Sequence, residues 1–289
     1  DEFSVDMLDY NPAHFDRASI GDPGPQGNWD ILEAMAQALG SFKLRHDAGQ
    51  PIYPLEMTPD FDLWNMLSMQ AGHAALDLDA WHLTDAGSRD SQVRALDFIQ
   101  QCFHDLAIAA PVAKTKAAPG SLFAQQRASL LIAPSELTAS LPKFPYQFTL
   151  LPRDMARANL ARVHGWAVTA HSSQPQAALA LALFLARQPV HAGWRSTQKP
   201  ANADGPDALC YQALDESLLP RIDRRTAPLA QFLDQQIGLL ALNAGEKTDV
   251  LYARIQAQYR NGFAPPAVAE GAEMKPGPKV EPTTHPQGL

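Results

Sequence analysis

The chain has 289 residues, of which 46% are hydrophobic and 19% are charged, and its net charge at pH 7 is −8. This composition is ordinary for a folded globular protein, and the length suffices for one two-lobed domain or two small ones. The acidic balance argues against a nucleic acid as the main partner, because nucleic-acid binding requires a basic face.

Hydrophobic periodicity predicts helices and strands in irregular alternation along the chain. Helices are expected where apolar residues recur at helical spacing, over 27–44, 61–72, 91–107, 174–187, 229–242 and 249–259. Strands are expected in short apolar runs bounded by turn residues, over 3–10, 51–57, 128–133, 144–151 and 165–170. One helical turn is expected over 121–126. This order of elements favours an α/β domain.

The two ends of the chain differ from its middle. Residues 264–289 are rich in Pro and Gly and have little apolar content, so we expect a disordered tail or linker after a folded region over 1–263. No signal peptide is recognisable before the first strand, and the chain begins with Asp1, so we expect a mature or truncated N-terminus. The longest apolar stretch, 177–186, has about half of the roughly 20 residues that a membrane-spanning helix requires.

Reactive and catalytic features are few. Cys102 and Cys210 could form one disulfide, but two cysteines make no framework, and the redox compartment stays open. No nucleophile elbow, phosphate-binding loop, H-E-x-x-H or C-x-x-C motif occurs. His73 and His82 lie near acidic residues, yet at no recognised metal-ligand spacing. The sequence therefore predicts neither an enzyme nor a cofactor or metal site.

Six segments, in order along the chain, carry a resemblance to a known family. They are Tyr10-Asn11-Pro12 followed by Asn28-Trp29-Asp30, Trp64 with Gly72, Phe123 to Leu131, Phe148 to Pro152, Gly165 to Ala178, and Gln198-Lys199-Pro200-Ala201. Together they resemble the extracellular solute-binding proteins of ABC importers, in the maltodextrin-binding-like group. Each segment alone is weak, and the resemblance rests on their series over about residues 3–260.

The resemblance implies an α/β periplasmic-binding-protein fold of type II, in which two lobes close about a hinge. In that family the Tyr-Asn segment lies well inside the chain, and most of the first lobe precedes it. Here the segment begins at residue 10. We therefore expect mostly the second lobe, with residues 165–200 returning to an incomplete first lobe.

The resemblance also implies a function and a site. The function is non-enzymatic binding of a small solute, above all a carbohydrate, for delivery to the membrane permease of an ABC importer. The protein would be a periplasmic or extracellular monomer, with or without a membrane anchor. Sugar C–H faces stack on flat rings while the hydroxyls need polar partners. On this basis we expect a cleft lined by Phe61, Trp64, Ser135, Glu136 and Trp166.

Some positions depart from the family pattern or allow two interpretations. Ser135-Glu136 occupy a place that often supplies a sugar-stacking Trp, which argues against maltodextrin itself. Asp60 and Asp62 either stabilise a helix N-terminus through the macrodipole or accept hydrogen bonds from sugar hydroxyls.

Two other functions also stay open. One is a ligand-sensing module of a larger regulatory protein, and the other is a degenerate lobe that serves protein interaction.

Overall fold

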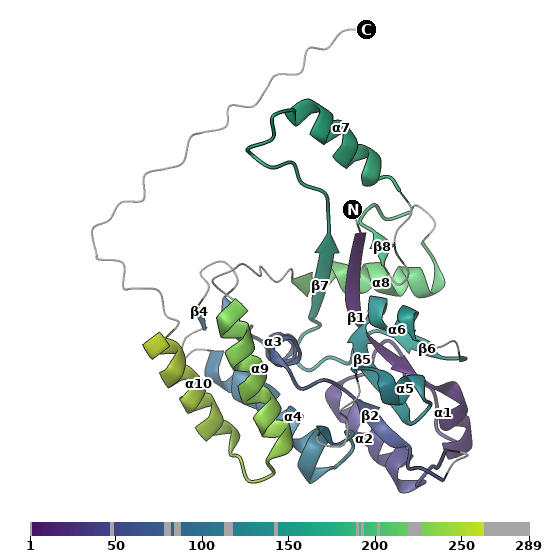
Figure 1. Ribbon diagram of the computed structural model, residues 1–289. Coiled ribbons are helices and arrows are strands. Elements are labelled where there is room, and N and C mark those ends of the chain that lie inside the picture. Colours follow the sequence, from purple (N-terminus) through teal and green to yellow (C-terminus); the bar gives the residue numbers. More distant parts are fainter. Residues whose placement is uncertain are drawn as a thin grey trace.

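The computed structural model describes residues 2–46, 49–77, 82–83, 88–112, 118–141, 144–188, 191, 194–200, 203–218 and 227–262, and all structural statements concern these residues. The predicted tail over 264–289 lies outside them. Figure 1 shows a central sheet flanked by helices, which is the α/β class predicted from the sequence.

The elements follow one another in mixed order. The strands are β1 (Glu2–Tyr10), β2 (Tyr53–Glu56), β3 (Leu76–Asp77), β4 (His82–Leu83), β5 (Ala128–Pro134), β6 (Gln147–Thr149), β7 (Asn159–His164), β8 (Arg195–Ser196) and β9 (Ser217–Leu218). The helices are α1 (Pro12–Ala18), α2 (Trp29–Ser41), α3 (Phe61–Gln70), α4 (Arg89–Gln100), α5 (Ser121–Ala124), α6 (Ser135–Ser140), α7 (Pro175–Leu185), α8 (Gly205–Asp215), α9 (Ala227–Leu242) and α10 (Thr248–Gly262). A π-helical turn over Gln101–Asp105 continues α4.

β1 is the central strand, and it changes partners midway. Its residues 2–5 pair antiparallel with β7, and its residues 6–10 pair antiparallel with β5. β2 runs parallel to β5 and β9 runs parallel to β7, which gives the order β2-β5-β1-β7-β9. One strand thus joins two parts of the molecule. We call β2, β5, β6, helices α1 to α6, α9 and α10 the large lobe, and β7, β8, β9, α7 and α8 the small lobe.

The two faces of β1 bury different residues, because side chains alternate along a strand. Phe3, Val5 and Met7 pack in a small cluster with Cys210 and Tyr211 of α8. Leu8 and Tyr10, on the opposite face, join the main core of the large lobe. Alternation places Ser4 and Asp6 on that second face as well, where they face α6 and α3 instead of α8.

Local capping explains where two helices of the large lobe begin. Asn28 precedes α2, and its Oδ1 accepts a hydrogen bond from the Ile31 N–H at 2.8 Å. Asp60 precedes α3 and accepts in the same way from the Leu63 N–H at 2.9 Å. Asn and Asp are preferred at this position because each satisfies one of the unpaired N–H groups of the first turn. The helix-stabilising role expected for Asp60 is confirmed.

One predicted strand is wrong, and the eleven-residue helix α8 was not predicted. The strand expected over 165–170 lies earlier, as β7 over Asn159–His164. The register pairs Glu2 with His164, so residues after His164 have no β1 residue opposite them among those described. The polar turn residues around Asp204 concealed α8, which begins with Gly205 and Pro206 and buries Cys210 and Tyr211.

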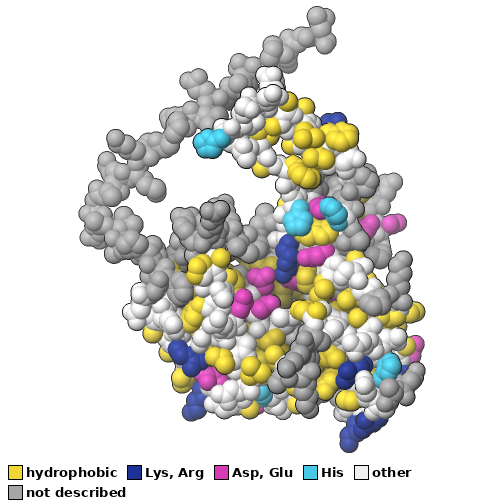
Figure 2. Space-filling view, in the orientation of Figure 1, with side chains coloured by type: hydrophobic (Ala, Val, Ile, Leu, Met, Phe, Trp, Pro, Cys, Tyr) yellow, Lys and Arg dark blue, Asp and Glu magenta, His cyan; other side chains and the backbone are white. Residues whose placement is uncertain are grey.

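The small lobe contains a helix with no buried residue. α7 has the sequence PQAALALALFL, and its Leu179, Leu181, Leu183 and Phe184 are each exposed by 51–60%. Figure 2 shows these apolar side chains gathered at the top of the molecule. A helix this apolar on all sides is ordinarily buried in a core.

The structure describes both cysteines of the chain. Cys102 and Cys210 are both buried and free, so the conceivable disulfide between them does not form. Burial raises the pKa of Cys210 to about 11 and the pKa of Cys102 still further.

Within the described part of the chain, none of the helices has both the length and the hydropathy needed to cross a bilayer.

Candidate functional site

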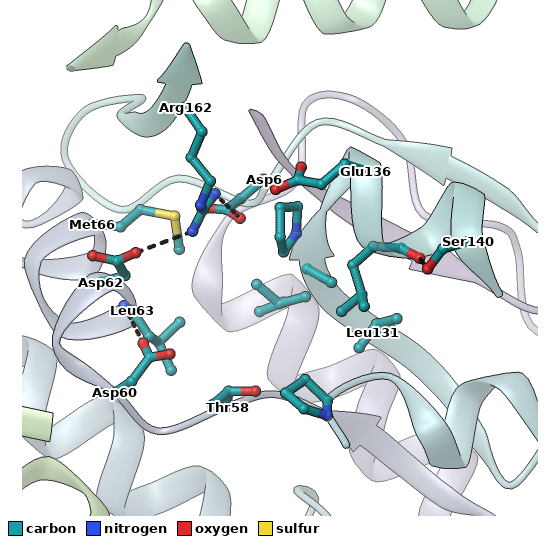
Figure 3. A pocket seen from close by; sticks show the side chains of 15 residues that line it. Asp6, Thr58, Asp60, Asp62, Leu63, Met66, Leu131, Glu136, Ser140 and Arg162 are labelled. Atoms are coloured by element: carbon teal, nitrogen blue, oxygen red, sulfur yellow. Dashed lines mark hydrogen bonds and ion pairs between the residues drawn. The ribbon is translucent and has the colours of Figure 1, made fainter. Parts of the chain in front are cut away.

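A cavity of about 460 Å³ opens where the two lobes meet, and Figure 3 shows it from close by. Its volume falls within the range of about 300–1,000 Å³ that is typical of small-molecule pockets. Its polar walls come from β1, β7, α3 and α6 together with the loop before α3. They consist of Asp6, Thr58, Asp60, Asp62, Glu136, Ser140 and Arg162. Its apolar walls consist of Leu63, Met66, Pro119, Leu131, Ile132, Ala133, Pro134 and Leu137.

Arg162 spans the pocket from the small lobe to the large one. Its Nη1 donates to Asp6 Oδ1 at 3.0 Å, and its Nη2 donates to Asp62 Oδ2 at 3.1 Å. Burial works to lower the pKa of Arg162, but the surrounding carboxylates outweigh burial and raise it above the ordinary value. The guanidinium is therefore a fixed positive charge, held between a carboxylate on β1 and one on α3.

Asp6 is nearly buried at the point where β1 changes partners. Its backbone N–H donates to Asn159 Oδ1 at 3.1 Å, and its C=O accepts from Asn159 Nδ2 at 2.7 Å. The Asn159 side chain thus takes the place of a strand partner here. Burial raises the pKa of Asp6 to about 6, although Arg162 works to lower it.

The first turn of α3 supplies two further carboxyl groups. Asp60 caps the helix, and Asp62 lies in its first turn, where it meets Arg162. Burial raises the pKa of Asp60 to about 7, and the nearby charges of Asp62, Asp234 and Asp6 add to the rise. The Leu63 N–H works in the opposite direction. Asp234, from α9, accepts a hydrogen bond from the Phe61 N–H at 2.8 Å, which ties α9 to the start of α3.

α6 contributes the fourth carboxyl group because it begins directly where β5 ends. Glu136 lines the pocket, and its Oε2 is buried without a hydrogen-bond partner among the residues described. Burial raises the pKa of Glu136, against the lowering effects of its own backbone N–H, Arg162 and His164. Ser135 lies beside it, but its Oγ is 3.1 Å from Ser4 Oγ and does not line the pocket.

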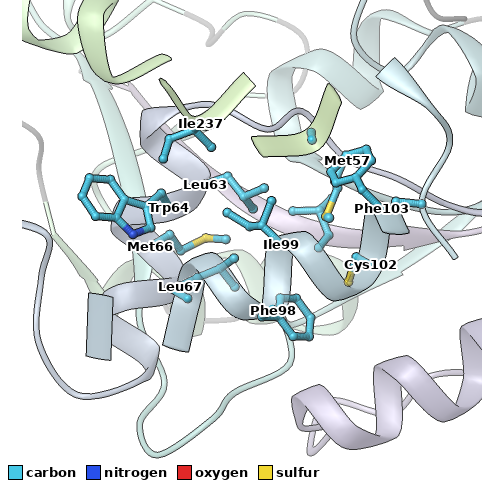
Figure 4. Packing of buried hydrophobic residues seen from close by; sticks show 14 of the residues in the cluster. Met57, Leu63, Trp64, Met66, Leu67, Phe98, Ile99, Cys102, Phe103 and Ile237 are labelled. Atoms are coloured by element: carbon cyan, nitrogen blue, oxygen red, sulfur yellow. The ribbon is translucent and has the colours of Figure 1, made fainter. Parts of the chain in front are cut away.

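Two of the expected cleft residues lie behind the pocket wall. Trp64 is fully buried, and its indole N–H donates to the Gln92 C=O at 3.0 Å. Figure 4 shows it among the packed side chains of the core. Phe61 is only 8% exposed and packs edge-on against Trp64. The structure therefore places Trp64 outside the lining of this pocket, because helical spacing turns Asp62 and Met66 toward the pocket and Trp64 away from it.

Trp166 belongs to a different part of the molecule. It is 58% exposed and lines a second cavity, of about 950 Å³, between β7 and α7. Glu2 lies in the same cavity and contacts His191 Nδ1 at 2.6 Å, while the ring of His164 stacks on Trp194 at 3.8 Å between centroids. The structure thus does not bring Trp166 together with Glu136, and none of the described residues lining the first pocket has an aromatic ring.

Two central residues of the pocket, Asp6 and Arg162, were not among the expected site residues. Two aspartates, Asp6 and Asp9, inside the otherwise apolar run 3–10 were a usable signal for buried carboxyl groups, but this signal does not single out Asp6. No comparable signal marks Arg162. Its segment was not recognised as a strand, and its distance from Asp6 depends on the pairing of β1 with β7.

Solved structures with the same fold are numerous, whereas the sequence matches no protein-family model and no curated protein. One is the ABC substrate-binding protein Lmo0181 from Listeria monocytogenes in complex with cycloalternan. The TM-score is 0.69 at 16% identity, over 91% of this chain and 71% of that one. Another is maltose-bound MalE3 from T. maritima, with a TM-score of 0.67 at 15% identity over 90% and 71%.

A third structure with this fold is UgpB from Mycobacterium tuberculosis in complex with glycerophosphocholine. The TM-score is 0.69 at 18% identity, over 90% of this chain and 69% of that one. The chain therefore has the two-lobed α/β fold of ABC-importer solute-binding proteins, and it spans about seven-tenths of the length of these structures. The fold class predicted from the six segments is confirmed.

Proposed function

We propose that this chain binds a small polyhydroxylated solute, of the carbohydrate class, without changing it chemically. The observation that carries the proposal is the pair of hydrogen bonds from Arg162 to Asp6 and Asp62 across a cavity at the junction of the lobes. Fixed donors and acceptors beside an apolar wall suit a ligand with many hydroxyls on a carbon skeleton. The structures with the same fold support this class of ligand, since two of those cited hold a sugar.

The likeness in fold and the acidic net charge support the remaining parts of the proposal. We propose that the solute is delivered to the permease of an ABC importer, that the protein acts as a monomer in the periplasm or outside the cell, and that no nucleic acid is involved. Residues 165–200 of the small lobe would then correspond to the returning segment of the family's first lobe. Closure about β1 and β7 would bring its surface toward the large lobe around the solute.

Titration of the 289-residue chain with a sugar panel tests the proposal, with calorimetry and thermal unfolding as readouts. A bound solute raises the melting temperature by mass action, and about 100-fold excess over Kd adds about 2.7 kcal/mol to the unfolding free energy. Arg162→Met should weaken binding at least about tenfold, because a charge-assisted hydrogen bond is lost. The matched control is Arg254→Met, which removes an arginine paired with Glu246 on another face.

The milder variant Asp62→Asn keeps the shape of the site and separates a binding defect from a folding defect. Its side chain is about one-third exposed, so we expect the variant to fold and to bind more weakly. Unchanged affinity in both Arg162→Met and Asp62→Asn would remove the site assignment. A panel in which no sugar or polyol stabilises the chain would contradict the function itself.

One observation favours a second candidate, in which the chain serves protein interaction. The apolar side chains of α7 are exposed without a covering element among the described residues. Exposed apolar surface of this kind marks interaction sites in soluble proteins. Sedimentation velocity tests this candidate: self-association that disappears in a Leu181→Ser, Phe184→Ser double variant would support it, and a concentration-independent monomer would contradict self-association.

A further inference from the structure

The pocket holds more carboxyl groups than basic groups. Four carboxyl groups, from Asp6, Asp60, Asp62 and Glu136, share it with a single guanidinium among the described lining residues. Two of the five N–H donors of that guanidinium are already used, because Nη1 donates to Asp6 and Nη2 donates to Asp62. Asp60 uses one oxygen to cap α3. Each of the four carboxyl groups therefore has an acceptor oxygen to spare, and among them Glu136 is the one with a buried oxygen, Oε2, that has no hydrogen-bond partner among the described residues.

We infer that the bound solute carries a protonated amine on its polyhydroxylated skeleton, as a cationic amino sugar does, and that Glu136 is the counter-ion of this amine. This inference rests on the proposed function and names the ligand class for the same pocket. Glu136 is assigned because its Oε2 is shielded from solvent and has no hydrogen-bond partner among the residues described. An ammonium group donates up to three hydrogen bonds and accepts none, which suits a wall of unpaired carboxylate oxygens.

The same wall disfavours the other charge types. An anionic sugar would bring a further carboxylate against this acidic wall in a half-enclosed site, where charges interact more strongly than in water. A neutral pyranose would leave the Glu136 carboxylate without a charged partner. It would also find no ring to stack on, because none of the described lining residues is aromatic. A cation therefore gains the most from these walls.

Matched sets of sugars test the inference on the full 289-residue chain. Each set has an amino sugar, its neutral parent and its uronate on one skeleton: glucosamine with glucose and glucuronate, and the corresponding galacto and manno sets. The chitosan disaccharide and its N-acetylated form extend the comparison to a larger size. Calorimetry at about pH 6.5 keeps the amine protonated. We expect the Kd of the amine to be lower than the Kd of its neutral parent by at least about tenfold. We also expect the Kd of the amine to rise as salt is added.

Glu136→Gln tests the assigned counter-ion, because it keeps the shape of the side chain and removes the charge. We expect the preference for the amine over the neutral parent to shrink to about threefold or less. Asp16→Asn is the matched control, since Asp16 is exposed on α1 and does not line the pocket. It should keep the full preference. A Glu136→Gln variant that keeps the full preference would overturn the counter-ion assignment.

The outcomes distinguish this inference from the function on which it rests. If a neutral or anionic sugar binds as tightly as its amine, or more tightly, the inference is overturned while the proposed function stands. If the amine binds best but salt has no effect, the charge explanation is overturned. If no member of any set binds, both the inference and the proposed function fail.

Discussion

Two helices of similar length, α3 in the large lobe and α7 in the small lobe, have opposite surroundings. α3 has ten residues and buries nine of them, including polar Asn65, Ser68 and Gln70. α7 has eleven residues and buries none, although its sequence is the more apolar of the two. Composition therefore does not decide burial here. What decides it is whether other elements pack around the helix, as α4 and α9 do around α3.

The comparison also separates the places where a mutation acts on stability from those where it acts on binding. One face of α3 forms the wall of the pocket and the opposite face anchors the core, so its residues divide by helical position. α7 offers neither role within the described residues. Substitutions matched between the two helices should therefore have very different effects on the unfolding free energy.

The largest expected effect comes from Trp64. Trp64→Ala should lower the unfolding free energy by about 3–5 kcal/mol, because it leaves a cavity in the core and the Gln92 C=O without its donor. Chemical denaturation followed by far-UV circular dichroism measures this. Trp166→Ala is the matched control, and we expect a change within about 0.5 kcal/mol at that exposed position. Equal losses in the two variants would contradict the burial of Trp64.

A smaller effect is expected from Asp60, and it depends on pH. Burial raises the pKa of Asp60 in the folded protein to about 7, so the folded state binds more protons than the unfolded state between about pH 4 and pH 7. Stability contributed by protonated Asp60 is therefore lost as the pH rises through this window. Asp60→Asn should raise the unfolding free energy at about pH 8 by about 2–4 kcal/mol and leave it unchanged near pH 4, because Asn caps a helix as well as Asp.

Urea denaturation at a series of pH values measures the effect of Asp60→Asn. Asp204→Asn is the control, since Asp204 also precedes a helix, α8, but is exposed and makes no capping hydrogen bond. Asp6 has a pKa of about 6 and adds a slope of the same sign to wild type and variant alike. An Asp60→Asn variant that parallels wild type at every pH would show that Asp60 is ionised in the folded protein throughout this range.

The smallest expected effect concerns α7. Leu181→Ser should change the unfolding free energy by no more than about 0.5 kcal/mol, because Leu181 is already 57% exposed to water. Leu67→Ser, at a position only 2% exposed on α3, should cost about 3 kcal/mol or more. Thermal unfolding of both variants at low protein concentration measures the difference. A strongly destabilised Leu181→Ser variant would indicate that α7 is packed in solution.

Much of the fold could be predicted from local signals. The strand over 3–10, the helix over 27–44 and the amphipathic helix over 91–107 were expected from periodicity, and all three are present. The strand near residue 160 was misplaced because NLARVH alternates weakly, whereas the run over 165–170 looks more like a strand than its surroundings allow. Only the pairing with β1 distinguishes the two.

The site was less predictable than the fold. Glu136 was expected at the pocket and lies there, whereas the rings of Phe61 and Trp64 were assigned to the cleft without knowledge of which face of α3 meets the core. Asp6 and Arg162 are 156 positions apart and meet through antiparallel pairing of distant strands. Such a contact leaves no trace in local periodicity, so the sequence of either segment alone could not reveal it.

The exchange of partners along β1 has a mechanical consequence. At Asp6 the strand leaves one ladder and enters another, and the Asn159 carboxamide, not a neighbouring backbone, holds both its N–H and its C=O. A side-chain amide can follow a twist that a continuous ladder would resist. The junction therefore permits rotation of one lobe relative to the other. Such a rotation would change the distance between Arg162, on β7, and Asp62, on α3.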